Sequence, residues 1–586
     1  MSTNGLVIYG ELLKKYEGND ETIIVPEGVT CIGIDAFKDC KNVKTVLLPE
    51  SVKTICSWAF SGCEKLMMIN LPDSITKIES YAFENCVNLK TINIPNGITK
   101  IGSVFDEDEV EDYISKYAFW GCSGLVAIDL PETLEELSGG LFNDHTNITN
   151  ITLPKNIRSI DNAFSGCTEL TTVILPDNLR EIGSCAFEGC TNLKQINIPD
   201  GVECISDGAF SGCVNLATIS FPDNLKEIGG SAFAGCTGLK MDKLVIPSSV
   251  EEIGSGAFEG CTGIESVELP ESITELGDDA FSNCIGLSSF EIPKGIDRFS
   301  AISGCTEIKS IIIPNNIKTI GHGAFAGCTS LEEVVIPESV ETMEHSIFEG
   351  CSNLKKVSIP HSLKEINDYT FQECVSLEKI DIPDNIEFIG EYVFYECTSL
   401  KTISLPEKIK NICNSTFANC SALTNVVIPE NVEKISYDAF RGCSNLEHIN
   451  IPKSVTVIES GAFAECESLK KIEIPGSVTD IEGETFKGCF NLESVNILKG
   501  VETIGEEAFA ECEKLKEIVF PEGVTSIEYA AFEGCEALEK VTIPMSVETI
   551  DTYAFGDFTP DFKIICKKNS YAHEFAIEEG INVQII

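Results

Sequence analysis

The segment Ala186-Phe187-Glu188-Gly189-Cys190 returns along the whole chain with little change. It appears 23 residues later as Ala209-Phe210-Ser211-Gly212-Cys213, and the same spacing continues on both sides. Aligned on the phenylalanine, the chain divides into 23 units, most of them 23 residues long, with Ile302 taking the Phe place in one unit. Self-similarity at this period is typical of a solenoid, in which each unit buries its apolar side against its neighbours.

The rest of the unit explains how one turn of such a solenoid would be built. In the unit that contains Ile92 and Ile94, these side chains alternate with Asn93, which predicts a short strand with one buried and one solvated face. Pro95 follows and ends the strand, because proline has no N–H to continue the ladder. A second extended piece, Val-x-x-Ile, comes next. Ala-Phe-x-x-Cys is too short for a standard helix, so we expect a tight turn with its Phe and Cys pointing inward.

Cysteine is abundant but confined largely to one place in the repeat. Of 27 cysteines, 21 lie three residues after the repeated Phe or its replacement. Disulfide frameworks pair cysteines from different structural positions, and metal sites need ligands that converge from several directions. Free cysteine packs as a small hydrophobic residue. The sequence therefore predicts a reduced, buried cysteine column, as in a reducing compartment.

Charge restricts the partners. The chain has 92 acidic and 42 basic residues, a net charge of −50, so nucleic acid is an unfavourable partner and anionic membranes are disfavoured. No apolar run reaches 18 residues and the N-terminus has no secretory pattern, which predicts no membrane insertion and a cytoplasmic location. The alternative is a protein at the cell surface, or a secreted one, that is exported by a route not visible in the sequence.

The ends and one interruption depart from the repeat. Residues 1–21 predict an N-terminal hairpin cap, residues 22–560 the solenoid, and residues 561–586 a strand-helix-strand cap. Solenoids need such caps because their terminal units would otherwise expose the core. An acidic insert at about residues 103–115 should loop into solvent.

The unit, with Ile-Pro, Val-x-x-Ile and Ala-Phe-x-x-Cys, resembles the BspA-like, or treponemal-type, class of leucine-rich repeats over about residues 23–555. The resemblance implies a right-handed leucine-rich-repeat superhelix of mainly short parallel β-strands with tight turns, and places the parallel strands on its concave side. It also implies protein binding and adhesion, since many members of this class are secreted or surface-exposed.

Catalytic and metal-binding patterns are weak. The sequence has no P-loop, no His-Glu-x-x-His and no Cys-x-x-Cys, which predicts no enzyme, no cofactor and no metal. His322 and His345 should lie on adjacent turns, where chance placement is favoured over a metal site. His145 replaces a cysteine of the column and is interpreted as part of a displaced loop. The acidic insert lacks the glycine of a calcium loop, so a solvated loop is favoured there.

The solvated strand face is the predicted site of function. Exposed apolar side chains mark interaction surfaces when they cluster, whereas single ones are common. The candidate partner-binding residues on this face are Ile174, Val245, Ile312, Val335, Val427 and Val519. The sequence thus predicts a non-enzymatic scaffold that binds a protein partner, of unknown identity, through its concave parallel sheet. The alternative is a surface-exposed or secreted adhesin that binds host or matrix proteins.

Overall fold

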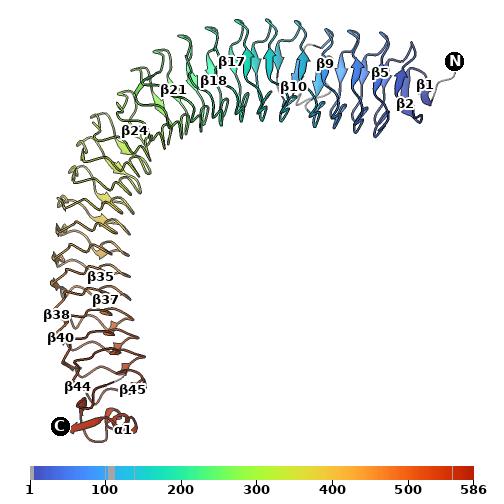
Figure 1. Cartoon of the computed structure of the whole chain (residues 1–586). Helices are drawn as coiled ribbons and strands as arrows, with labels where there is room; N and C mark the ends of the chain where they lie inside the picture. Colours follow the sequence, from blue (N-terminus) through green and yellow to red (C-terminus); the bar gives the residue numbers. More distant parts are fainter. Residues whose placement is uncertain (1–4, 99, 103–112, 116, 138, 557) are drawn as a thin grey trace. The chain divides into compact units, whose positions relative to one another are not determined.

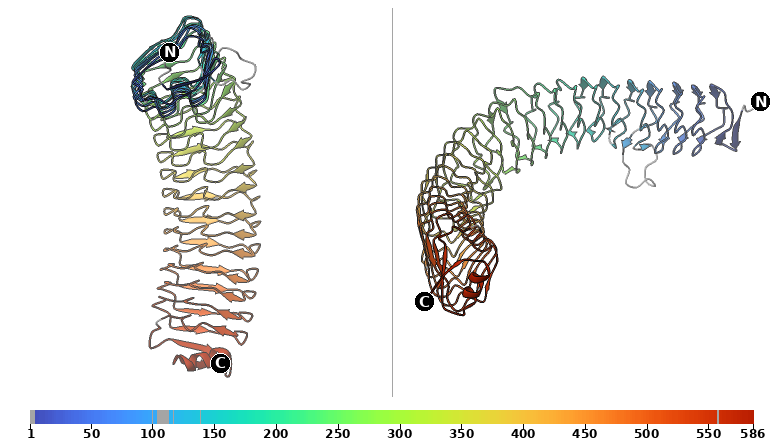
Figure 2. Two further views of the ribbon diagram at one scale, coloured as in Figure 1. Left: turned by 90° about the vertical axis from the view of Figure 1, so that its right-hand side faces the viewer. Right: turned by 60° about the horizontal axis from the view of Figure 1, so that its bottom comes forward.

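In the computed structural model the chain is a parallel β-solenoid of about 24 turns. The structure describes residues 5–98, 100–102, 113–115, 117–137, 139–556 and 558–586. It consists of two compact units, Met1–Ile296 and Asp297–Ile586. Within each unit, strands of successive turns lie side by side (Figures 1 and 2), so the predicted solenoid class is confirmed.

Each turn contributes up to two short strands, which stack into two columns. The first-strand column holds the Leu-x-x-Ile-x-Ile segments. In Met1–Ile296 its members are β3 (Thr22–Ile24), β5 (Thr45–Leu47), β7 (Met68–Asn70), β9 (Thr91–Asn93), β12 (Ala127–Asp129), β14 (Asn150–Thr152), β16 (Thr172–Ile174), β20 (Leu244–Val245) and β22 (Val267–Glu268). In Asp297–Ile586 its members are β26 (Glu333–Val335), β28 (Lys356–Ser358), β30 (Lys379–Ile380), β32 (Thr402–Ser404), β34 (Asn425–Val427), β36 (His448–Asn450), β38 (Lys471–Ile474), β40 (Ser494–Ile497), β42 (Glu517–Val519) and β44 (Lys540–Thr542).

The second-strand column holds the Val-x-x-Ile segments. In Met1–Ile296 its members are β4 (Cys31–Ile32), β6 (Thr54–Ile55), β8 (Lys77–Ile78), β10 (Lys100–Gly102), β11 (Tyr113–Ser115), β13 (Glu136–Leu137), β15 (Ser159–Ile160), β17 (Glu181–Ile182), β18 (Cys204–Ile205), β19 (Glu227–Ile228), β21 (Glu252–Ile253) and β23 (Glu275–Leu276). In Asp297–Ile586 they are β24 (Arg298–Phe299), β25 (Thr319–Ile320), β27 (Thr342–Met343), β29 (Glu365–Ile366), β31 (Phe388–Ile389), β33 (Asn411–Ile412), β35 (Lys434–Ile435), β37 (Val457–Ile458), β39 (Asp480–Ile481), β41 (Thr503–Ile504), β43 (Ser526–Ile527) and β45 (Thr549–Ile550).

The register within both columns is in step with the repeat. Ile23 of β3 pairs with Val46 of β5, one repeat later. The Ala-Phe-x-x-Cys turn forms a third ladder, because the Phe37 amide donates to the Ala59 carbonyl of the next turn at 2.7 Å. Neighbouring turns are therefore joined by backbone hydrogen bonds at three places, which satisfies groups that a single turn would leave unpaired.

The core lies between the two strand columns and contains the repeated Phe and Cys. Successive Phe rings stack almost in parallel, as in Phe60 and Phe83, whose centroids are 5.2 Å apart with planes at 4°. Both rings are fully buried. The thiols fill the adjacent column: Cys63 Sγ donates to the Phe37 carbonyl of the preceding turn at 3.0 Å. The predicted tight turn with inward Phe and Cys is confirmed.

Irregular turns are repaired locally. In the turn without the repeated Phe, Ile302 is buried in its place and Phe299 from the second strand fills the remaining space. The Phe299 ring lies 5.6 Å from Phe325 of the next turn, tilted by 38°.

The position of His145 differs from the displaced loop that the sequence predicts. The residue is only 2% exposed, it packs edge-on against Phe142 at 6.1 Å, and its Nδ1 is 3.0 Å from the Asn143 carbonyl oxygen. An imidazole therefore replaces the thiol inside the core.

The acidic insert changes the strand order of the second column. The order here is β8-β11-β10-β13, so β11 lies between β8 and β10. The first column continues directly from β9 to β12 across the same place. The insert thus adds one strand to the second column and none to the first. Residues 103–112, for which a solvated loop is predicted, lie outside the described residues.

The two ends have their own elements. Strands β1 (Leu6–Tyr9) and β2 (Leu12–Tyr16) form an antiparallel hairpin, and β2 pairs with β4. At the other end, β46 (Lys563–Cys566) and β47 (Asn582–Ile585) extend the first-strand column. Between them, helix α1 (Tyr571–Glu578) begins at Ser570, whose hydroxyl accepts from the His573 amide. These elements lie where the sequence places strands and a helix.

Candidate partner-binding face

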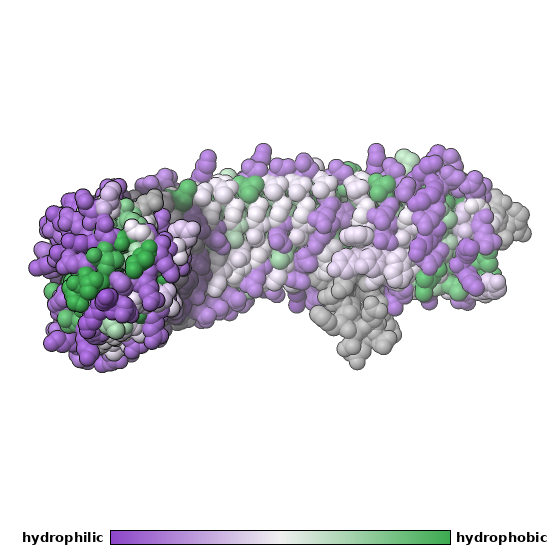
Figure 3. All heavy atoms as spheres, turned by 90° about the horizontal axis from the view of Figure 1, so that it is seen from below, coloured by the Kyte–Doolittle hydropathy of each residue, from purple (hydrophilic) through white to green (hydrophobic). Residues whose placement is uncertain are grey.

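The exposed face of the first-strand column is formed by the side chains that alternate with the buried Ile and Val. In β26, for example, Val334 is buried while Glu333 and Val335 are exposed. Each three-residue strand therefore presents two side chains to solvent, and stacking arranges them into two rows along the unit. Figure 3, which views the molecule from below relative to Figure 1, shows a side that is mostly hydrophilic or intermediate, with hydrophobic side chains in small groups.

All six predicted residues point outward on this face. Their exposed fractions are between 52% and 84%, for Ile174, Val245, Ile312, Val335, Val427 and Val519. The structure brings only two of them together. Ser310 bridges to Glu333, which places Ile312 beside Val335 on the next turn. Their exposed fractions are 84% and 58%, so this pair is a continuous apolar contact area on a polar face.

The other four predicted residues have polar neighbours in the register. Ile174 pairs with Thr152, and Val245 pairs with Glu268. Val427 lies between Ser404 and Asn450. Val519 pairs with Thr542. As isolated apolar side chains they are ordinary features of a protein surface.

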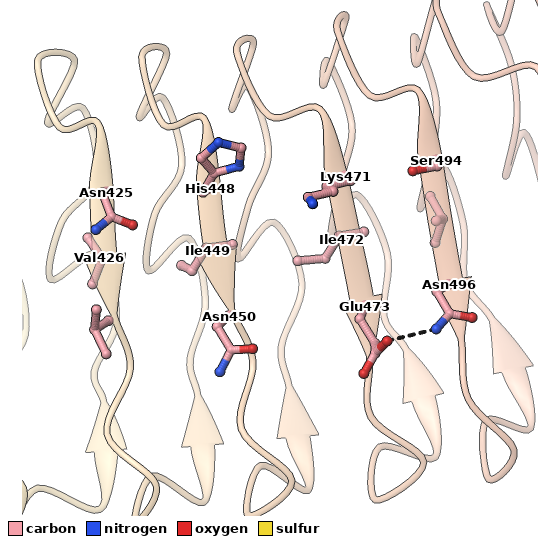
Figure 4. A pocket seen from close by; sticks show the side chains of 12 residues that line it. Asn425, Val426, His448, Ile449, Asn450, Lys471, Ile472, Glu473, Ser494 and Asn496 are labelled. Atoms are coloured by element: carbon pink, nitrogen blue, oxygen red, sulfur yellow. Dashed lines mark hydrogen bonds between the residues drawn. The ribbon is translucent and has the colours of Figure 1, made fainter.

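A polar hollow lies on strands β34, β36, β38 and β40 (Figure 4). Its volume is about 630 Å³. One row of its wall consists of Asn425, His448, Lys471 and Ser494, and the other contains Val427, Asn450, Glu473 and Asn496. The Asn496 amide donates to Glu473 at 2.7 Å. The hollow thus combines a row rich in donors with a row rich in acceptors, which suits the polar groups of a peptide backbone.

Sequence reasoning missed this hollow. It took binding candidates only from the central row of the strand, which includes Asn450 and Asn496, and left out the row two residues earlier, which includes His448 and Lys471. The alternation of the strand predicts both rows, since residues i and i−2 share a face. Reading both rows together would have placed a histidine beside a lysine on adjacent turns.

Ion pairs join neighbouring turns at the edge of this face. Lys355 Nζ lies 2.9 Å from Glu332, and Lys356 Nζ lies 2.6 Å from Glu333. The hydrogen bond from the Lys355 ammonium lowers the pKa of the Glu332 carboxyl. Exposed pairs of this kind contribute little to stability, so we interpret them as fixing side-chain positions on the face.

Candidate metal ligands are spread apart in the part of the chain that the structure describes. Across its described ranges, no three His, Cys, Asp or Glu side chains are grouped closely enough to hold a metal ion. His322 and His345 do lie on adjacent turns, since the Gly323 amide donates to the His345 carbonyl at 3.1 Å. The His345 ring is 3.5 Å from Asp368, an exposed contact that needs no metal to explain it.

Comparison with known families identifies the repeat. The family model of the BspA type leucine-rich repeat region (6 copies) matches residues 15–113, 111–240, 238–355, 318–447 and 435–560. The chain belongs to the BspA-type leucine-rich-repeat family. Such repeat proteins are typically protein-binding modules or surface adhesins, and the scaffold is generally non-enzymatic. The resemblance inferred from Ala-Phe-x-x-Cys and its neighbours is therefore confirmed.

Solved structures of other leucine-rich-repeat proteins are similar to the chain. A leucine-rich repeat protein from Bacteroides ovatus is 29% identical, with 72% of this chain and 92% of that chain covered and a TM-score of 0.43. A leucine rich cell surface protein from Faecalibacterium prausnitzii is 30% identical, with coverage of 59% and 89% and a TM-score of 0.39. The leucine rich repeat protein of T. pallidum is 29% identical, with coverage of 31% and 82% and a TM-score of 0.27. No curated protein matches the chain.

The cytoplasmic location expected from the sequence receives no support from these comparisons. Within the described ranges, no helix is long and apolar enough to cross a membrane.

Proposed function

We propose that the chain is a non-enzymatic scaffold that binds a protein partner through the exposed face of its first-strand column. The observation that carries this proposal is the apolar pair Ile312 and Val335 on neighbouring turns, surrounded by polar side chains. Interaction surfaces commonly combine an apolar centre with a polar rim. The other predicted residues are proposed as outlying contacts on the first-strand column of their own unit, Ile174 and Val245 in Met1–Ile296 and Val427 and Val519 in Asp297–Ile586.

The polar hollow supports the same function. Its four strands lie in the unit that carries Ile312 and Val335, and Lys471 and Glu473 present opposite charges on one strand. A peptide segment laid along the face could satisfy its backbone groups on His448, Asn450 and Asn496. The face would then select a partner by both shape and hydrogen bonding.

The proposal is tested by the double variant Ile312→Lys with Val335→Lys. Proteins retained by the immobilised wild-type chain are identified by mass spectrometry, and the affinity of the purified partner is then measured for wild type and variant. We expect binding to weaken at least tenfold, because two charges would enter the apolar centre. Both side chains are exposed, so the melting temperature should not change.

Ile174→Lys is the control, because it places one lysine at an isolated position of the first-strand column. It should weaken binding much less than the double variant. Unchanged affinity in the double variant would remove the Ile312 and Val335 pair from the binding site.

Whether the chain binds its partner in the cytoplasm or outside the cell is tested on intact cells. Protease added outside should leave the chain whole if it is cytoplasmic. Degradation of the chain while cytosolic markers survive would instead support the adhesin alternative.

A further inference from the structure

A second surface of the molecule carries a cluster of exposed aromatic side chains. Trp58, Tyr81 and Tyr117 occupy one position of the turn on three successive turns of Met1–Ile296, and Trp120 stands three residues after Tyr117. We call these four residues the aromatic turn cluster. They line a hollow of about 470 Å³ together with Glu84. The chain has two tryptophans, and both are in this cluster.

The rings are ordered by the repeat. Trp58 stacks on Tyr81 with centroids 5.6 Å apart and planes at 3°, and Tyr81 stacks on Tyr117 at 5.6 Å and 16°. Trp120 meets Tyr81 edge-on at 6.4 Å and 89°. Trp58, Tyr117 and Trp120 are 38%, 37% and 46% exposed. The cluster is thus a rigid aromatic wall that is open to solvent.

The backbone under the stack is strained. Trp58, Tyr81 and Tyr117 have φ angles of 57°, 58° and 63°, in the left-handed region. Other turns of the same unit place glycine here, as at Gly208 and Gly256, or a smaller side chain, as at Cys185 and Ser231. A bulky residue there costs about 1–2 kcal/mol, and an aromatic pair returns about 0.5–1.5 kcal/mol. Stability alone therefore gives little reason to place three aromatic residues at this position.

The chemistry of the hollow favours a cation. Glu84 places a carboxylate beside the rings, and in the described part of the chain it accepts from the neutral Ser61 hydroxyl at 2.7 Å and forms no ion pair. Aromatic rings attract cations through their negative faces. The same cluster already shows this attraction, since the Lys38 ammonium lies 6.0 Å from the Trp58 ring centroid.

Among cationic groups, a guanidinium fits best. It is planar, it stacks on aromatic faces, and it pairs with a carboxylate through two hydrogen bonds. Trp58 and Tyr117 stack on the two sides of Tyr81, so the ring surface open to a guanidinium is that of Trp58, Tyr117 and Trp120. The net charge of −50 also attracts basic partners and disfavours a second copy of this acidic chain.

We propose that the aromatic turn cluster is a docking site for an arginine side chain on a basic segment of a protein partner, with the guanidinium held between Glu84 and the rings. The site lies on the turns and uses no residue of the first-strand face. It therefore gives the molecule a second contact surface that is independent of the first.

The test uses the tryptophans as their own probe. A blocked peptide with two arginines in a Gly-Ser background is titrated into the full chain while tryptophan fluorescence is followed. The same peptide with citrulline in place of arginine is the ligand control, because citrulline keeps the shape and removes the charge. We expect a saturable fluorescence change with the arginine peptide and none with the citrulline peptide.

Glu84→Gln should weaken the arginine peptide about tenfold while both tryptophans and the fold remain. Glu188→Gln is the matched control, because Glu188 holds the same position of the turn and accepts from Ser165 at 3.3 Å, but follows Cys185 instead of an aromatic residue. It should leave binding unchanged. The variant Ile312→Lys with Val335→Lys should also bind the peptide normally, which separates this site from the first-strand face.

Several outcomes would overturn the proposal. They are the absence of any fluorescence change or heat of binding at millimolar arginine peptide, equal binding of the citrulline peptide, equal weakening by Glu188→Gln, and saturable binding of a neutral oligosaccharide instead of the peptide. Chain association that rises with protein concentration and disappears in Glu84→Gln would assign the cluster to a second copy of this chain.

Discussion

The molecule contains two kinds of aromatic stack, one inside and one outside. Phe60 and Phe83 lie 5.2 Å apart at 4°, and Trp58 and Tyr81 lie 5.6 Å apart at 3°. The geometry is nearly the same, yet both Phe rings are fully buried and Trp58 is 38% exposed. Stacking therefore follows from the repeat itself, since equal positions on successive turns are one strand spacing apart. What the stack does depends on where it lies.

The two stacks also differ in what surrounds them. Phe233 of the inner column, for example, belongs to the same turn as Cys236, whose thiol donates to the Phe210 carbonyl of the preceding turn at 3.2 Å. The outer stack sits on left-handed backbone beside the Glu84 carboxylate. Stacking of the inner Phe rings adds to the stabilisation from burying them, whereas stacking of the outer rings only offsets the strain of the backbone that carries them. The inner stack should therefore contribute mainly to folding stability, and the outer stack mainly to partner recognition.

Of the changes considered, alkaline pH should reduce folding stability the most, because it ionises the buried thiols beside the inner Phe stack. Burial raises the pKa of the Cys236 thiol to about 12, from an ordinary value near 9. Between these values the unfolded state loses a proton that the folded state keeps, so stability is full below pH 9 and falls as pH rises toward 12. One such group loses about 4 kcal/mol over the whole interval. Thiolate absorbance and circular dichroism should change together in an alkaline titration.

The contrary result would be titration of most thiols near pH 9 with the fold intact. That result would mean that the cysteine column is open to solvent. A control at pH 10 with high salt should separate thiol ionisation from general charge repulsion, because salt screens only the latter effectively.

Phe233→Ala should have the next largest effect. Phe233 lies 5.2 Å from Phe210 and 5.3 Å from Phe258, so its removal leaves a cavity between two rings. We expect a loss of about 3–5 kcal/mol in the free energy of unfolding of Met1–Ile296, measured with denaturant. Phe233→Leu should cost clearly less. A cost below about 1 kcal/mol for the alanine variant would show that the column can collapse around a missing ring.

Trp58→Gly should have the smallest effect on stability. The substitution loses one stacked pair but relieves a φ of 57°, and these terms are of similar size. We expect the free energy of unfolding to change by less than about 1 kcal/mol in either direction. The same denaturant experiment as for Phe233→Ala checks this expectation. A loss as large as that of a buried Phe would mean that the outer stack is structural.

Much of the fold could be predicted because equivalent residues recur at a nearly fixed spacing, which sets the strand register between neighbouring turns. The Pro after Ile94 and the recurring Phe and Cys predict two strands and a turn, and the structure has them. Local repairs could not be predicted. Phe299 is buried in the turn that lacks the repeated Phe, 5.6 Å from Phe325, and His145 is buried where other turns have a thiol.

The sites were harder to predict than the fold. On the strand face, the sequence identifies exposed apolar residues, but taking binding candidates from one row leaves out His448 and Lys471 in the other. In the turns, Tyr81 and Tyr117 are 36 residues apart, because the insert separates them. The spacing in residues therefore does not reveal this stack, whereas a comparison of equivalent positions on successive turns would reveal it. Both sites were missed because residues were compared along the sequence, whereas each site is formed by equivalent positions on successive turns.

The cysteine column has one more consequence, which concerns local opening. Its first and last members, Cys40 and Cys535, are partly exposed, whereas those between them are buried. Almost every turn thus carries one thiol of the column, and the residue number of that thiol identifies its turn. Solenoids open from their ends and wherever neighbouring turns hold each other weakly. The rate at which a thiol reagent modifies each cysteine should therefore map, turn by turn, how firmly each part of the chain is held.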